Sequence, residues 1–297
     1  MTKHSFLLSF LPSFLFATGL ALACIALLIG PGAGRCLAAE DLPRGAIVES
    51  VGTQADARQT YALYLPSNYT PARKWPVLYA FDPAGRGKLP VELFRAAAER
   101  YGYIVVGSNN SRNGLATSVV METVNTLWRD THARLSINDE RVYATGFSGG
   151  ARVANRLAAS CRNCVAGVIS CGAGFPADIA PDASLTYAFF GTVGVDDFNF
   201  REMRLLERTL DALGVVNRLA TFDGKHGWCP EAVCAEGIEW MELLAMKRGR
   251  KGRDDAFVEG ALARLSARVE SLKRPEDAYE RYVLLRVIAT TFDGLRD

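Results

Sequence analysis

Apolar positions after residue 40 follow two alternating patterns. Short runs rich in Val, Ile, Leu, Tyr and Phe predict strands, and longer stretches with apolar residues three and four positions apart predict helices. The predicted strands are 46–51, 60–65, 76–81, 103–107, 142–147, 166–171, 187–191 and 218–222. The predicted helices between them are 90–101, 117–135, 150–160 and 200–213.

This alternation predicts an α/β fold with a mostly parallel eight-stranded sheet flanked by helices. The first two strands come before any helix, so we expect them to be antiparallel and the later strands to be parallel and buried on both faces. After residue 222 only helices are predicted, at 231–246, 256–272 and 277–292. The chain therefore ends in a helical appendage.

Residues 1–39 have the composition of an export signal. Lys3 is followed by an uncharged stretch that is apolar from Phe6 to Ile29, and the small residues Ala38 and Ala39 come directly before Glu40. We expect the protein to be exported, either to a periplasm or into the medium, after this segment is cleaved. If the segment stays in place, it is long enough to anchor the chain in a membrane.

Three parts of the chain follow from these patterns: the export segment 1–39, an α/β domain at 40–246 and a helical C-terminal extension at 247–297. The run from Lys247 to Arg253 is basic, but Asp254 and Asp255 follow it at once. We therefore interpret this run as a solvated linker between helices rather than as a surface for phosphate or membrane.

Charge outside the export segment is balanced. The chain has 34 Lys and Arg, of which Lys3 and Arg35 lie in residues 1–39, so 32 remain against 32 Asp and Glu. A neutral body has no overall field that captures nucleic acid, and we expect no nucleic-acid partner. Membrane contact is expected only through the N-terminal segment.

Five cysteines follow the export segment, and an odd number leaves at least one thiol unpaired. In an oxidising compartment the pairs Cys161/Cys164 and Cys229/Cys234 can each close a short loop, with Cys171 as a small apolar residue on a strand. Spacing alone does not decide the pairing. A zinc site is disfavoured, because the two pairs are far apart in the sequence and nothing else resembles a zinc module.

The segment Gly146-Phe147-Ser148-Gly149-Gly150 lies between a predicted strand and a predicted helix. A serine on such a tight turn exposes its hydroxyl group, and flanking glycines allow the strand and the helix to pack closely. Ser148 is therefore a candidate nucleophile. The amide of Gly149, at the start of the helix, is a candidate donor to an oxyanion. The alternative is an ordinary Gly-Ser turn.

A serine nucleophile needs a base, and the chain has three histidines. His4 lies in the export segment and His132 near the end of a predicted helix, which leaves His226, in a glycine-flanked loop after the last predicted strand. A carboxylate must orient this imidazole, and Asp196 and Asp197 follow the strand 187–191. We favour Asp197 and keep Asp196 as the alternative acid; an Asp here can also cap the next helix.

The order Ser148, Asp197, His226, each after a separate strand, resembles the α/β-hydrolase superfamily over residues 46–246. The motifs at 146–150 and 191–199 and the sequence His226-Gly227-Trp228 are most similar to exported carboxylesterases related to polyhydroxybutyrate depolymerases and feruloyl esterases. The resemblance implies a serine esterase with a Ser-His-Asp triad, acting on a small-molecule or oligomeric ester. We expect no cofactor, and with two histidines after the export segment a His-based metal site is disfavoured.

One segment departs from the family pattern. Such depolymerases follow the third strand with His-Gly-Cys, whereas this chain has Phe81-Asp82-Pro83-Ala84-Gly85. Pro83 has no N–H group, so the second oxyanion donor is expected from Asp82 or Ala84. An Asp82 carboxylate close to a developing negative charge is unfavourable unless that side chain points away.

Three further residues are expected to line the substrate pocket. Trp228 and Phe198 flank the predicted acid and base, and Asn113 follows the fourth predicted strand at the same edge of the sheet.

Two alternatives to an esterase remain: a serine peptidase of the same fold, and a catalytically silent binding protein of the cell envelope whose partner surface is the helical tail.

Overall fold

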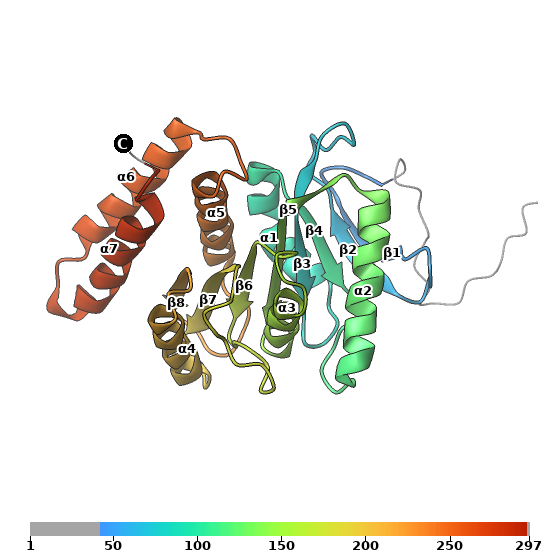
Figure 1. Cartoon of the computed structure of the whole chain (residues 1–297), viewed down its shortest axis with the longest axis horizontal. Helices are drawn as coiled ribbons and strands as arrows, with labels where there is room; N and C mark the ends of the chain where they lie inside the picture. Colours follow the sequence, from blue (N-terminus) through green and yellow to red (C-terminus); the bar gives the residue numbers. More distant parts are fainter. Residues whose placement is uncertain (1–41, 296–297) are drawn as a thin grey trace, which may run out of the picture. The chain divides into compact units, whose positions relative to one another are not determined.

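The computed structural model describes residues 42–295, which form one eight-stranded sheet and its flanking helices (Figure 1). The predicted export segment lies outside the described residues. All eight predicted strands are present: β1 Ile47–Gly52, β2 Thr60–Tyr64, β3 Trp75–Phe81, β4 Ile104–Ser108, β5 Ile137–Phe147, β6 Gly167–Cys171, β7 Ala188–Gly194 and β8 Asn217–Phe222.

Strand β5 is longer than predicted. It begins at Ile137, where it pairs with Trp75 of β3, and an irregularity in the register follows before Val142. Asn138, Asp139 and Glu140 are polar and point away from the core, so they interrupt the apolar run that marks a buried strand. The sequence pattern therefore detects only the buried half of β5.

The strands lie in the order β1-β2-β4-β3-β5-β6-β7-β8. Strand β1 is antiparallel to β2, β2 is antiparallel to β4, and the remaining pairs are parallel, as predicted. Because β5, β7 and β8 are parallel, their carboxyl ends lie at the same edge of the sheet. The loops that carry the three candidate residues begin at that edge.

Helices cover both faces of the sheet (Figure 1). Helices α2, α3 and α4 pack against one face, and α1 and α5 pack against the other. Strand side chains alternate between the two faces, as Leu78 and Tyr79 do, and the apolar side chains on both sides are buried. The helix bounds are α1 Lys88–Tyr101, α2 Thr117–Arg134, α3 Gly149–Ser160, α4 Phe200–Ala212, α5 Glu231–Lys247, α6 Asp255–Ser271 and α7 Ala278–Phe292, with a 3₁₀ turn at Pro275–Asp277.

The C-terminal helices pack against α5 through a small apolar cluster of their own. Leu243 and Met246 of α5 contact Val258 of α6 and Phe292 of α7 in this cluster. Helix α7 also reaches across the border of the sheet beside β8. Its residues Tyr279 and Arg286 bond to Glu207 of α4, and its Thr291 accepts a hydrogen bond from Trp240 of α5.

The basic run at the end of α5 is more closely packed than a solvated linker. The Lys251 Nζ donates to Oε2 of Glu242 at 2.5 Å, and Glu242 is fully buried. Glu242 also accepts hydrogen bonds from Tyr103 and Arg141, so it joins α5 to the sheet. Arg248 is half-buried, and burial lowers its pKa below the ordinary value. The interpretation of this run as solvated was wrong for Lys251 and Arg248. Lys251 neutralises the buried carboxylate of Glu242, and Arg248 donates to the carbonyl oxygen of Ala166.

Candidate active site

Ser148 lies on the turn between β5 and α3, in a backbone conformation that L-amino acids rarely adopt. Its φ of 53° and ψ of −118° fall outside the ordinary regions, and Asn163 is the other non-glycine residue with positive φ in the described chain. Such strain is typical of functional turns that expose a side chain. The hydroxyl group therefore stands at the edge of the sheet, as expected for a nucleophile turn.

The glycines around Ser148 are required by close backbone contacts. A Cβ at Gly146 would collide with the carbonyl oxygen of Gly150, and a Cβ at Gly150 would collide with the carbonyl oxygen of Phe81. The turn packs tightly on itself and on the end of β3. The G-x-S-x-G spacing thus has a steric reason in this chain.

His226 lies beside Ser148. The Nε2 atom of His226 is 2.9 Å from the Oγ atom of Ser148, and these two residues come from loops 78 positions apart. Two aromatic rings contact the imidazole, with centroids 4.6 Å away for Phe147 and 4.1 Å away for Phe198. These contacts restrict its orientation.

Asp197 faces the other nitrogen of the imidazole. Both of its carboxylate oxygens are 2.9 Å from the Nδ1 atom of His226, and its side chain is fully buried. Asp196 is exposed, and its amide donates to the carbonyl oxygen of Gly224. The geometry therefore selects Asp197 over Asp196. A carboxylate only accepts, so Nδ1 carries the proton and Nε2 is left to accept one from Ser148.

Two residues that hold Asp197 were not predicted. Gly172 has a φ of +65°, and a Cβ at this position would lie 3.2 Å from Oδ2 of Asp197. The side-chain amide of Asn199 donates to the carbonyl oxygen of Gly172, while its backbone amide donates to Oδ1 of Asp197 at 2.7 Å. In the sequence, the one signal for these contacts was that Gly172 comes directly after a predicted strand. A glycine at this place is also common in ordinary turns.

The loop after β3 supplies one candidate oxyanion donor rather than two. The amide of Ala84 donates to Oδ1 of Asp82 at 2.9 Å, so it is already engaged. The amide nitrogen of Asp82 lies 3.3 Å from the position of a Cβ at Gly150, next to the serine turn. Gly149 begins α3 and directs its amide toward the same turn. Gly149 and Asp82 are therefore the remaining donor pair.

The carboxylate of Asp82 points into its own loop. Its oxygens accept hydrogen bonds from Arg86 at 2.9 and 3.0 Å and from the indole N–H of Trp228 at 2.9 Å. Burial raises the pKa of Asp82, but the bonds from Arg86, Trp228 and the Ala84 amide lower it more, and the pKa lies below its ordinary value. Its negative charge is thus balanced by Arg86, and Trp228 links this loop to the loop of His226.

The other residues predicted to contact substrate have different environments. Phe198 is 76% exposed and covers His226 from the solvent side. Asn113 lies against the serine turn, because a Cβ at Gly149 would collide with its Oδ1 atom.

His132 lies on α2, where its ring stacks on Trp128, and burial lowers its pKa. It takes no part in the group of Ser148, His226 and Asp197, which we call the Ser148 cluster.

The cysteines form one bond and one cluster. Cys161 and Cys164 are joined by a disulfide bond. Cys171 is buried on β6, and its Sγ atom lies 3.7 Å from that of Cys229, which lies 3.2 Å from that of Cys234. Burial raises the pKa of the Cys171 thiol well above its ordinary value. This cluster packs beneath the loop of His226 as a small apolar contact.

Residues 42–295 contain no group of three or more His, Cys, Asp or Glu side chains placed to hold a metal ion. Within the same residues, no helix has the length and apolar content needed to cross a membrane.

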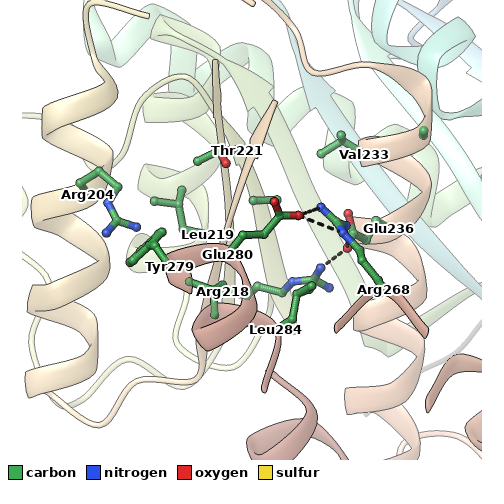
Figure 2. A pocket seen from close by; sticks show the side chains of 13 residues that line it. Arg204, Arg218, Leu219, Thr221, Val233, Glu236, Arg268, Tyr279, Glu280 and Leu284 are labelled. Atoms are coloured by element: carbon green, nitrogen blue, oxygen red, sulfur yellow. Dashed lines mark hydrogen bonds and ion pairs between the residues drawn. The ribbon is translucent and has the colours of Figure 1, made fainter. Parts of the chain in front are cut away.

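A hollow of about 210 Å³ lies beside β8, between α4, α5 and α7 (Figure 2). Three arginines line it, and each is paired: Arg218 with Glu236, Arg268 with Glu280, and Arg204 with Glu207. None of the Ser148 cluster is among its lining residues. Because its charges compensate one another, this hollow offers no chemistry comparable to that at Ser148.

Comparison with known proteins gives a fold but no sequence family. No family model matches the chain. No curated protein matches it either.

Solved structures that resemble the chain include hydrolases. One is FphF, a fluorophosphonate-binding serine hydrolase of Staphylococcus aureus, at 13% identity and a TM-score of 0.55, covering 67% of this chain and 99% of that one. Another is an esterase of Pyrobaculum calidifontis, at 13% identity and a TM-score of 0.53, covering 70% and 88%. A ferulic acid esterase has 17% identity and a TM-score of 0.50, covering 66% and 97%. The chain thus has the α/β-hydrolase fold.

Proposed function

We propose that this protein is a serine hydrolase that cleaves carboxylic esters. The observation that carries the proposal is the continuous line of hydrogen bonds from Asp197 through His226 to Ser148, each 2.9 Å long. A hydroxyl group with a general base and a buried carboxylate behind it is the arrangement that activates serine. The esterase and serine hydrolase names of the similar structures support the same reaction class.

In the first half of the reaction, Nε2 of His226 accepts the Ser148 proton as Oγ bonds to the ester carbonyl carbon. The amides of Gly149 and Asp82 stabilise the tetrahedral oxyanion. The carbon–oxygen bond to the alcohol then breaks, and His226 returns the proton to the leaving oxygen. Asp197 keeps Nδ1 protonated and stabilises the imidazolium that forms.

In the second half, a water molecule attacks the acyl-enzyme. His226 takes a proton from this water, the same amides hold the second oxyanion, and the bond to Oγ breaks as His226 returns the proton to Ser148. The products are a carboxylic acid and an alcohol, and the enzyme is restored. The residues act without a cofactor or a metal ion.

We also propose that the protein works outside the cytoplasm. The disulfide bond between Cys161 and Cys164 supports an oxidising compartment, and the composition of residues 1–39 supports export.

The test compares Ser148→Ala with Ser160→Ala, an exposed serine at the end of the same helix. Ser148→Ala should lower kcat for 4-nitrophenyl butyrate by about 10⁴-fold or more and abolish labelling by a fluorophosphonate, while Ser160→Ala keeps both. Equal turnover in both variants would contradict the proposal. Faster cleavage of the matching 4-nitroanilide would favour a peptidase, and no labelling of the wild type would favour a silent binding protein.

A further inference from the structure

A second hollow, of about 220 Å³, lies directly beside the serine turn. Four segments form its walls: the loop between β4 and α2, the first turn of α2, the first two turns of α3, and the loop after β6. Arginines, apolar side chains and Gly149 of the serine turn are among its lining residues. We call it the α3 hollow.

The α3 hollow shares a wall with the candidate active site. Gly149, whose amide is a candidate oxyanion donor, lines it, and Asn113 packs against Gly149. At about 1.5 Å per residue, Arg152 and Arg156 lie about 6 and 12 Å along the axis of α3 from Ser148. Helical side chains lean toward the N-terminus of their helix, which here is the end that carries Ser148. A chain bonded to Ser148 can therefore extend into the hollow.

Charge in the α3 hollow is positive. Three arginines line it, and no lining residue is acidic. Arg152 pairs with Glu202, and Arg156 pairs with Asp178, but both acids stand outside the lining. Among the described residues, no carboxylate pairs with Arg112, whose side chain is exposed on the loop after β4. The guanidinium group of Arg112 is thus left without an acidic partner.

Apart from the arginines, most side chains of the lining are apolar. Leu115, Val120, Val153 and Pro176 supply hydrocarbon surface, and Asn113 and Thr117 are polar. Such a surface favours a short methylene chain, and the uncompensated guanidinium favours an anion at the end of that chain.

The direction of catalysis decides which part of the ester enters the hollow. His226 must protonate the leaving alcohol, so the alcohol lies on the His226 side of Ser148. Neither His226 nor its neighbours Trp228 and Phe198 line the α3 hollow. The part of the substrate that remains bonded to Ser148, which is the acyl group, is therefore the part placed in it.

We propose that the preferred substrates are esters of dicarboxylic acids, or other esters whose acyl chain ends in an anionic group bound by Arg112. This inference rests on the proposed ester hydrolysis and adds the class of acyl group. Arg152 and Arg156 are held by their pairs with Glu202 and Asp178, which leaves Arg112 as the uncompensated charge of the hollow.

The experiment compares two 4-nitrophenyl esters of equal chain length, the adipate monoester and the neutral hexanoate, at low ionic strength. Wild-type kcat/KM should be about tenfold higher for the adipate monoester than for the hexanoate. Arg112→Gln should lower this ratio about tenfold, mainly by raising KM for the adipate monoester, as expected for the loss of one hydrogen bond to a charged group. Arg95→Gln, an exposed arginine of α1 on the other face of the sheet, is the control and should keep the wild-type ratio.

The outcomes separate the two proposals. If the wild type hydrolyses both esters with equal kcat/KM, or if Arg112→Gln lowers both equally, the anionic subsite is wrong and the esterase stands. If the wild type hydrolyses neither ester above the Ser148→Ala rate, the proposed function itself fails. Salt should reduce the wild-type ratio but not that of Arg112→Gln, because screening weakens an exposed ion pair.

Discussion

At the scale of single residues, function depends on atoms brought together from distant loops. Ser148, Asp197 and His226 were predicted because each residue type has a known part in acyl transfer and each follows a strand. Gly172 and Asn199 position Asp197, Arg86 binds the carboxylate of Asp82, and none of these roles was predicted. Their roles depend on contacts across the fold, which a local sequence pattern does not contain.

Adjacent carboxylates with different contacts give a residue-scale prediction. Asp197→Asn should lower kcat by about 10⁴-fold, because an amide can donate to Nδ1 and so favours the wrong imidazole tautomer. Asp196→Asn is the matched control, since Asp196 is exposed and does not touch His226. The measurement is kcat for 4-nitrophenyl butyrate at pH 7 to 8, with circular dichroism as the check on folding. Similar losses in the two variants would argue against the assignment of Asp197.

At the scale of elements, the sequence predicted most of the fold. Buried parallel strands appear as continuous apolar runs, so the eight strands and seven helices were detected with small errors at their ends. The first half of β5 was missed because its residues are polar. The basic run after α5 was misjudged because the burial of its partner, Glu242, depends on packing of α5 against the sheet and not on the local pattern. Strand order and loop contacts follow from packing rather than from local pattern.

A contact between two loops gives an element-scale prediction. Asp82 joins the loop after β3 to Trp228, and its folded-state pKa is lower than the ordinary value. Its contribution to stability is therefore complete above the unfolded-state pKa of about 4 and is lost as the pH falls through the folded-state pKa. Asp82→Asn should be less stable than the wild type at pH 7, and the difference should shrink at pH 3.

The control for this prediction is Asp56→Asn. Asp56 also has a lowered pKa, through Arg58, but that pair is exposed to solvent. Urea midpoints at pH 7 and pH 3 measure both variants, and Asp56→Asn should change the midpoint less because solvent screens the pair. A constant difference between wild type and Asp82→Asn at the two pH values would contradict the role assigned to the Asp82 carboxylate.

At the scale of the whole described chain, the C-terminal helices are joined to the α/β part through α4 and α5. Helix α7 bonds to Glu207 on one side of the sheet and to Trp240 on the other. It therefore crosses the border of the sheet beside β8, and Figure 2 shows Tyr279 and Glu280 of α7 beside that strand. The tail is packed into the structure although it supplies no residue to the Ser148 cluster.

Two aromatic residues of α7 test this view. Phe292 is buried in the cluster with Met246 and Val258, whereas Tyr282 is 60% exposed. Phe292→Ala should lower the free energy of unfolding by about 3–5 kcal/mol, and Tyr282→Ala by less than about 1 kcal/mol. Urea unfolding measures both, and kcat of the folded Phe292→Ala protein should match the wild type. Equal stability of the two variants would mean that the tail is not packed as described.

The passage of α7 across the border beside β8 has a consequence for solubility. A strand at the end of a sheet has one row of amide and carbonyl groups without a neighbouring strand, and such a row can recruit the same strand from another molecule. Helix α7 lies beside this edge of β8, where such a strand would have to approach. Cleavage by a protease between α5 and α6 would remove α6 and α7 and leave the edge of β8 open. The cleaved product would therefore be prone to self-association.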